Sequence, residues 1–192
     1  MPSKGNYIIC SNHESYFDPL WILAALGEQI SLKEVCCMAA KHTMNGKISK
    51  KLFDALGGIP VDREGNTIPA MNNAKRCLGS GRVMIIFPEG ARSRDGTMLP
   101  FKNGAAQLAL DTNTKILPIE IEGGFETFPR WIKYPRLFDW KHLKKYTIKI
   151  KIGSLIDPSD KSVFNITNQI RQEIIDMHNI CLLYTSPSPR DS

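Results

Sequence analysis

The sequence predicts an α/β domain with a mixed, largely parallel sheet flanked by helices. Short apolar runs alternate along the chain with stretches that have helical periodicity, as in βαβ units. The run at residues 83–87 is apolar throughout, which is typical of a strand buried on both faces of a sheet. Polar and glycine-rich segments follow several of these runs, where open α/β sheets place their ligands.

Helix-end signals divide the chain into elements. Asp18 and Pro19 suit the N-cap and the first position of a helix, and Gly57 with Gly58 suits the end of the next one. Apolar side chains spaced for one face support the helix that ends at these glycines. We therefore expect strands at residues 7–10, 35–40, 59–61, 83–87, 116–121 and 146–152, and helices at residues 18–26, 48–56, 68–78, 105–110 and 163–181.

The length of the chain, 192 residues, fits one domain with a single core. We expect this domain to span residues 1–182, because residues 183–192 show no periodicity and read as a non-native tail. Core-like sequence begins at Tyr7, so we also expect that an N-terminal membrane-anchoring segment is missing. No apolar run approaches the ~20 residues that span a bilayer.

The net charge indicates which classes of partner the protein could bind, and the cysteine content indicates its redox compartment. A net charge of +6 favours anionic partners, which include nucleic acid, phosphorylated metabolites and anionic lipid. None of the five cysteines lies in a CxxC pair, so we expect neither a zinc site nor a disulfide framework. A reduced, cytosolic setting fits this pattern.

Residues 12–18 (NHESYFD) directly follow the first predicted strand. His13 is of the residue type best suited to general-base chemistry near neutral pH. Asp18 could accept a hydrogen bond from the other ring nitrogen and so fix the tautomer. A structural reading is equally open, with His13 as a loop residue and Asp18 as a helix cap.

Residues 87–94 (FPEGARSR) continue the predicted apolar strand into a proline, a carboxylate, a glycine and two arginines. Such a turn can present Arg92 and main-chain N–H groups to an anion. The alternative is an ordinary exit from a strand into a loop.

Two further segments are weaker signals. Residues 57–63 (GGIPVDR) combine two glycines with Arg63, whose planar guanidinium suits phosphate, although a helix stop followed by a surface arginine explains the same residues. Residues 116–119 (ILPI) read as a strand with a kink, for which a structural role is favoured.

Together the four segments resemble the glycerolipid acyltransferase family, which includes lysophosphatidate acyltransferase. The blocks of that family are N-H-x4-D, G-x5-R, F-P-E-G-[T/S]-R-S and a proline-centred strand, and all four occur here in that order. Ala91 stands where the family has threonine or serine. The resemblance covers roughly residues 5–155 and implies the α/β fold of glycerol-3-phosphate acyltransferases.

The resemblance also implies roles for single residues. His13 is expected to deprotonate the acceptor hydroxyl, and Asp18 to orient His13. The hydroxyl would attack the thioester directly, so no covalent acyl-enzyme, metal or cofactor is implied. The residues expected to bind or shape the substrate site are Lys41, Arg63, Glu89, Gly90, Arg92 and Ser93.

Residues 125–146 interleave aromatic and basic side chains. This mixture suits a lipid headgroup interface, and an equally open reading is a loop whose aromatic side chains cover the core. Single-stranded nucleic acid is a weaker alternative, and we expect no nucleic-acid partner. The interface reading predicts a cytoplasmic protein that binds an anionic membrane surface peripherally or monotopically.

The activity implied by the resemblance is transfer of a fatty acyl group from acyl-CoA or acyl-carrier protein to 1-acylglycerol-3-phosphate, which forms phosphatidate. Alternative acceptors within the class are glycerol-3-phosphate and other lysophospholipids. The alternative outside the class is a non-catalytic domain that binds lipid or phosphate. Such a domain would not need the pair of His13 and Asp18.

Overall fold

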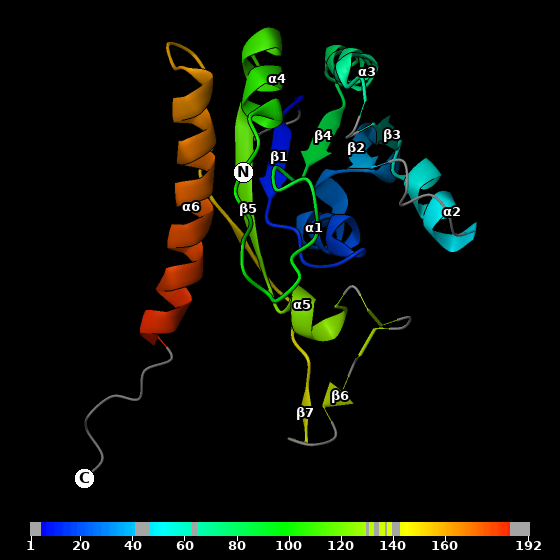
Figure 1. Cartoon of the computed structure of the whole chain (residues 1–192), viewed down its shortest axis with the longest axis vertical. Coiled ribbons are helices and arrows are strands. Elements are labelled where there is room, and N and C mark those ends of the chain that lie inside the picture. The colour runs from blue at the N-terminus through cyan, green and yellow to red at the C-terminus, as the bar shows by residue number, and fades with distance from the viewer. Residues whose placement is uncertain are drawn as a thin grey trace.

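Six strands form one mixed sheet in the computed structural model (Figure 1). Strands β1 to β5 are parallel, and β8 pairs antiparallel with β5, which confirms the predicted class of sheet. The structure describes residues 5–40, 47–62, 65–129, 131–132, 135–136, 138–139 and 143–184. In spatial order the strands are β3 (Ile59–Val61), β2 (Val35–Ala40), β4 (Val83–Ile86), β1 (Ile8–Ser11), β5 (Ile116–Glu122) and β8 (Lys149–Ile152).

Helices cover both faces of this sheet. Alternate side chains of a strand point to opposite faces, so Ile8 packs in one buried cluster and Ile9 in the other. The first cluster includes side chains of α3 (Ile68–Gly79), α4 (Gly104–Thr112) and α6 (Val163–Tyr184), and the second includes side chains of α1 (Asp18–Leu26) and α2 (Lys47–Ala55). In the described part of the chain, no helix is both long and apolar enough to cross a membrane.

The elements predicted from periodicity are present, with ends that shift by a few residues. The short 3₁₀ helices Gly27–Gln29 and Leu32–Glu34 were not predicted. A second difference is the segment after β5, where the sequence predicts a loop. It contains the short helix α5 (Gly124–Thr127) and a two-stranded sheet of β6 (Phe138–Asp139) and β7 (Lys144–Lys145), which Figure 1 shows at the lower end of the molecule. The residues of α5, β6 and β7 form neither a continuous apolar run nor a helical spacing by which the element could be recognised.

The end of α6 differs from the prediction, and one expectation about the cysteines is corrected. Helix α6 continues through Tyr184, past the predicted end at residue 181, whereas residues 185–192 lie outside the described part. Cys36 of β2 and Cys77 of α3 form a disulfide, against the expectation of none. The crossover from β3 to β4 lays α3 against the sheet, and it brings together two cysteines that lie 41 residues apart in sequence.

The parallel strands end along one edge of the sheet, and the predicted blocks begin at these ends. Residues 12–18 follow β1, residues 87–94 follow β4, and α5 follows β5. Because β1 lies between β4 and β5, these three segments are neighbours. Lys41 and Arg63, which come after β2 and β3, lie outside the described residues.

Candidate active site

His13 and Asp18 form a hydrogen-bonded pair, with 2.8 Å between Nδ1 of the histidine and Oδ2 of the aspartate. The buried Asp18 carboxylate also accepts from the N–H groups of Glu14 and Ser15, at 2.7 and 2.8 Å, and from the Ser15 hydroxyl at 2.5 Å. Since these other partners are all donors, the carboxylate acts as the acceptor and Nδ1 of His13 donates. In a neutral imidazole that donates through Nδ1, Nε2 carries the lone pair that a general base requires.

The N-cap role predicted for Asp18 is wrong. Phe17 is the N-cap of α1, it makes no side-chain capping bond, and Asp18 is the first helical residue. The Asp18 carboxylate turns back and accepts the N–H groups of Glu14 and Ser15 in the preceding loop. Of the two readings open from the sequence, the geometry favours Asp18 as the partner of His13.

The loop after β4 holds the main chain of His13 on both sides. Glu89 accepts the N–H of His13 at 2.7 Å through Oε1, and the N–H of Leu99 at 2.7 Å through Oε2. The N–H of Ser93 donates to the carbonyl oxygen of His13 at 2.9 Å. The ring of Phe87 stacks on the imidazole with 4.1 Å between centroids. Two loops from adjacent strands therefore fix the position of one imidazole.

In the third block, residues 87–94, a buried carboxylate and a tight turn shape the site. Burial raises the pKa of Glu89 to about 7. The Ser93 hydroxyl accepts the N–H of Gly96 at 2.8 Å and so closes the turn that follows. Gly90 has a φ of +69°, and a Cβ there would lie 3.2 Å from the side chain of Lys102. Lys102 was not predicted as a site residue, and the sequence holds no local signal that places it over Gly90.

Arg92 lies half-buried against the first block. The Cζ atom of its guanidinium is 3.4 Å from the centroid of the Tyr16 ring, a cation–π contact. The structure thus brings together His13, Asp18, Glu89, Gly90, Arg92 and Ser93 from the residues predicted for the site.

Two residues of the first block anchor it to the end of β5. Asn12 forms a pair of hydrogen bonds with the main chain of Ile121, at 2.7 and 2.8 Å. Glu14 accepts the N–H of Phe125 at 2.9 Å, and burial is the main cause that raises its pKa to about 8. Sequence reasoning missed Glu14, because its partner lies 111 residues further along the chain.

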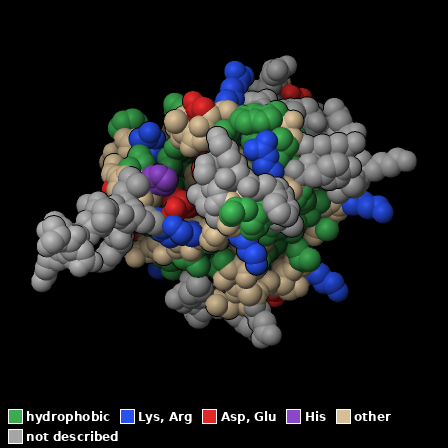
Figure 2. Space-filling view, turned by 90° about the horizontal axis from the view of Figure 1, so that it is seen from below, with side chains coloured by type: hydrophobic (Ala, Val, Ile, Leu, Met, Phe, Trp, Pro, Cys, Tyr) green, Lys and Arg blue, Asp and Glu red, His purple; other side chains and the backbone are tan. Residues whose placement is uncertain are grey.

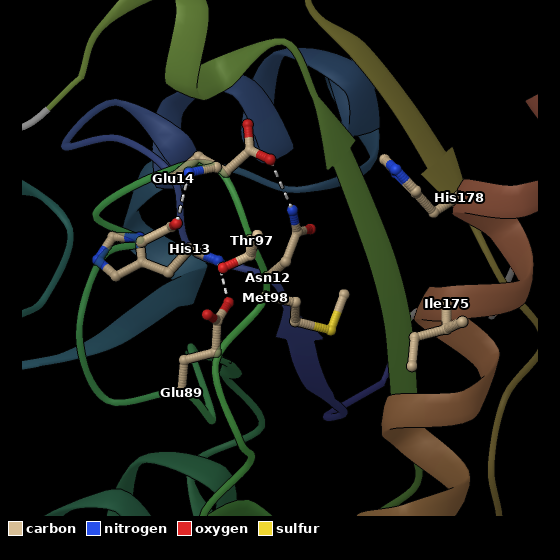
Figure 3. A pocket seen from close by; sticks show the side chains of 10 residues that line it. Asn12, His13, Glu14, Glu89, Thr97, Met98, Ile175 and His178 are labelled. Carbon is tan, nitrogen blue, oxygen red and sulfur yellow. Dashed lines mark hydrogen bonds between the residues drawn. The ribbon is translucent and has the colours of Figure 1, made fainter.

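A cavity of about 300 Å³ lies between the first block and α6 (Figure 3). Its wall includes Met98 from the loop after β4, and Ile175 and His178 from α6. Figure 3 shows the imidazole of His13 pointing away from Ile175 and His178, so the imidazole does not face the wall that α6 contributes.

The aromatic and basic stretch divides into a buried and an exposed part. Phe128 is buried and stacks on Phe17 with 5.1 Å between centroids, as the core-covering reading predicts. Trp131 is 61% exposed and contacts Phe125 edge-on. Figure 2, which looks onto the lower end of Figure 1, shows hydrophobic and basic side chains interspersed over this face. Five Trp, Tyr, Lys and Arg residues of the stretch lie outside the described part: Arg130, Lys133, Tyr134, Trp140 and Lys141.

The chain matches the model of the family described as Acyltransferase over residues 1–122. It therefore belongs to the acyltransferase family that the four blocks resemble.

Individual proteins similar to this chain have names that specify the acceptor as well as the acyl transfer. The mouse 1-acyl-sn-glycerol-3-phosphate acyltransferase alpha is 34% identical over 122 residues, which is 62% of this chain and 41% of the mouse protein. The 1-acyl-sn-glycerol-3-phosphate acyltransferase of Borreliella burgdorferi is 29% identical over 184 residues, which is 91% of this chain and 67% of that protein. The chain thus spans about two fifths of the length of its mammalian relatives.

A solved structure supports the fold. The crystal structure of the 1-acyl-sn-glycerophosphate (LPA) acyltransferase PlsC from Thermotoga maritima superposes with a TM-score of 0.71 at 23% identity. The superposition covers 97% of this chain and 70% of the PlsC chain. The architecture of strands and helices described above is therefore that of a known acyltransferase structure.

Proposed function

We propose that this protein transfers a fatty acyl group from a thioester, acyl-CoA or acyl-carrier protein, to the free hydroxyl of 1-acylglycerol-3-phosphate. The product is phosphatidate. The observation on which this proposal depends is the hydrogen bond between Nδ1 of His13 and the fully buried carboxylate of Asp18, and we assign the role of base to Nε2. The names of the relatives support the choice of acceptor.

In the proposed reaction, Nε2 of His13 takes the proton of the acceptor hydroxyl while its oxygen attacks the thioester carbonyl. The new bond joins this oxygen to the acyl carbon, and the carbon–sulfur bond breaks. The thiolate that leaves takes the proton back from the imidazolium, so His13 is neutral again. Asp18 stabilises the imidazolium and keeps the ring in the required orientation.

Direct transfer, without an acyl-enzyme, agrees with the burial and the raised pKa of the free cysteines in the described part of the chain. Cys10 and Cys37 are buried, and burial raises the pKa of both thiols, that of Cys37 to about 12. A thiol with so high a pKa forms little of the thiolate that acts as a nucleophile. We propose that the reaction needs no cofactor or metal besides the thioester substrate.

We assign the phosphate of the acceptor to Arg92, and we propose that Lys41 and Arg63 assist it. Arg92 follows β4, directly beside the loop that bears His13, so a phosphate bound there lies near the proposed base. A guanidinium suits phosphate because its planar fork of N–H groups matches two oxygen atoms. We also propose that the face shown in Figure 2 meets an anionic membrane from the cytoplasmic side, since both acceptor and product reside in bilayers.

The test is the release of free thiol by the purified protein across a panel of acceptors. The panel contains lysophosphatidate, glycerol-3-phosphate and lysophosphatidylcholine, each with acyl-CoA and with acyl-carrier protein. The proposal expects thiol release that depends on lysophosphatidate, together with phosphatidate as the product.

Each alternative has its own result in this panel. Turnover with glycerol-3-phosphate or lysophosphatidylcholine in place of lysophosphatidate would assign a different acceptor within the class. Binding of lysophosphatidate without turnover by either donor would indicate a non-catalytic lipid-binding domain.

A further inference from the structure

Tyr16 and Arg92 join the two loops of the proposed site through their side chains. Tyr16 follows β1 within the first block, and Arg92 follows β4 within the third. The guanidinium lies over the ring, with 3.4 Å between Cζ and the ring centroid. Hydrogen bonds of the main chain of His13 join the same two loops, so the loops are connected through both side chains and main chain.

The stacking geometry suits a role in phosphate binding. A guanidinium stacks on an aromatic ring through its face, whereas it binds phosphate through its N–H edge, so the two contacts do not compete. Arginine has many rotamers, and a side chain that is already held in one orientation loses less entropy when it binds its ligand. Contact with the Tyr16 ring therefore raises the affinity of Arg92 for an anion bound at the N–H edge of its guanidinium.

The Tyr16 ring is itself supported by α5 and its neighbours. Its centroid lies 6.4 Å from that of Phe128, and Phe128 stacks on Phe17 at 5.1 Å. Tyr16 remains 40% exposed, whereas Phe128 is buried. Phe128 thus packs beside the partly exposed Tyr16 ring, and this contact helps to fix the position of the ring face that Arg92 contacts.

We propose that Tyr16 is a positioning residue that orients Arg92 toward the phosphate of the acceptor, and thereby favours acceptors with a phosphomonoester. This inference rests on the proposed function, in which Arg92 binds that phosphate. Tyr16 touches neither of the reacting atoms in this account, and it acts through the orientation of Arg92.

The test compares Tyr16→Leu, which removes the aromatic face, with Tyr16→Phe, which keeps the face and removes the hydroxyl. The acceptor is a short-chain lysophosphatidate below its micelle concentration, so that membrane binding does not contribute. Tyr16→Leu should raise the acceptor KM about 2–5-fold, the factor expected from loss of a partly exposed cation–π contact. The thioester KM and kcat should stay within about 2-fold, and Tyr16→Phe should match the wild type.

Two further variants complete the comparison. Phe164→Leu removes an aromatic side chain that is 67% exposed on α6 and should change none of the three constants. Arg92→Lys keeps the charge but loses the planar fork, so it should also raise the acceptor KM selectively. In the Arg92→Lys background, Tyr16→Leu should have a smaller effect than it has alone, because the two residues act together.

A second measurement separates failure of this inference from failure of the proposed function. Glycerol-3-phosphate should raise the Tm of the wild type and of Tyr16→Phe, and raise that of Tyr16→Leu less, whether or not acyl transfer occurs. The inference is overturned if Tyr16→Leu matches the wild type in both acceptor KM and Tm shift, or if Tyr16→Phe is as impaired as Tyr16→Leu. A fall in kcat with an unchanged acceptor KM would also overturn it, because that result indicates a distorted loop.

Discussion

At the scale of single residues, the main feature is a histidine whose ring and main chain are both held by neighbours. The ring is fixed by Asp18 and Phe87, and the main chain by Glu89 and Ser93. The pairing of His13 with Asp18 could be predicted because a spacing of five residues keeps both within one loop and the helix start. The contacts with the third block could not be derived in the same way, since their geometry depends on which strands are adjacent.

The first prediction concerns Asp18→Asn. The amide oxygen of asparagine can take the place of Oδ2 and accept the same N–H groups, but the amide nitrogen then faces the Ser15 hydroxyl and the side chain carries no charge to stabilise an imidazolium. We expect kcat to fall about 10²-fold or more, because the imidazolium loses its carboxylate partner, and the Tm to fall as well, because hydrogen bonds to a neutral amide are weaker than those to a carboxylate. Steady-state kinetics and thermal unfolding measure the two effects, with Asp54→Asn on the exposed face of α2 as the control.

An unchanged kcat in Asp18→Asn would remove Asp18 from the proposed mechanism. An unchanged Tm would instead show that the loop tolerates the amide, and that the hydrogen bonds to the carboxylate contribute little to stability.

At the scale of elements, segments with a local apolar or helical pattern could be predicted from the sequence, and segments stabilised by distant contacts could not. The apolar run of β4 and the helical periodicity of α3 identify their type without reference to the rest of the chain. By contrast, α5 is stabilised by contacts such as that between Glu14 and the N–H of Phe125, which join segments far apart in sequence. The same limit explains why Glu14, Tyr16 and Lys102 were not predicted as site residues, since their partners are set by the fold.

The turn after β4 gives the second prediction, for Gly90→Ala. Gly90 has a φ of +69°, and an added Cβ would press on Lys102, whereas Gly104 has open space around its Cβ position. We expect Gly90→Ala to lower the free energy of unfolding by about 1–3 kcal/mol. Gly104→Ala, at the first position of α4, should leave it unchanged or raise it slightly. Denaturant titration of both variants is the measurement, and equal effects at the two positions would contradict the assignment of strain to Gly90.

The third prediction concerns pH and the contact between the first block and α5. Burial, with a further contribution from Asp18, raises the pKa of Glu14 from its ordinary 4.5 to about 8. Between these two values the folded state binds more protons at Glu14 than the unfolded state does, so stability falls as pH rises. Glu89, whose pKa is also raised, contributes in the same direction.

Glu14→Gln should therefore reduce the decline of Tm between about pH 5 and pH 8, by roughly 2 °C or more. Glutamine can still accept the N–H of Phe125 through its amide oxygen. Glu173→Gln on α6 is the matched control and should leave the decline unchanged. A decline in Glu14→Gln as steep as in the wild type would show that Glu14 does not titrate in this window.

At the scale of the whole molecule, the proposed site and the exposed part of the aromatic stretch belong to the same end. Figure 1 shows α5, β6 and β7 at the end toward which the parallel strands run, and Figure 2 shows the face that they help to form. A protein that takes its acceptor from a bilayer would need its base near the docking face. If the face in Figure 2 meets the membrane as proposed, the arrangement of the elements places the proposed base at the same end.

The fourth prediction is therefore weak, reversible binding to anionic vesicles that declines as salt rises, because exposed charges are screened. Trp131→Ala should weaken this binding, since an exposed tryptophan favours the headgroup layer. Phe164→Ala provides the control, because Phe164 is equally exposed but lies in the first turn of α6. Co-sedimentation at low and high salt measures the fraction of protein bound to vesicles. If neither higher salt nor Trp131→Ala reduces this fraction, this face is not the membrane-binding surface.

The central claim is that His13 acts as the base in direct acyl transfer, and His13→Ala tests it most directly. The measurement is thiol release with lysophosphatidate and acyl-CoA by the wild type and by His13→Ala, with His178→Ala as the control. His178 lines the same cavity from α6, but its ring nitrogen pairs with Glu120 and not with the first block. We expect His13→Ala to lose about 10²–10⁴-fold in kcat while it keeps its Tm and its stabilisation by glycerol-3-phosphate, and His178→Ala to remain active. Near-normal turnover by a folded His13→Ala protein would contradict the account.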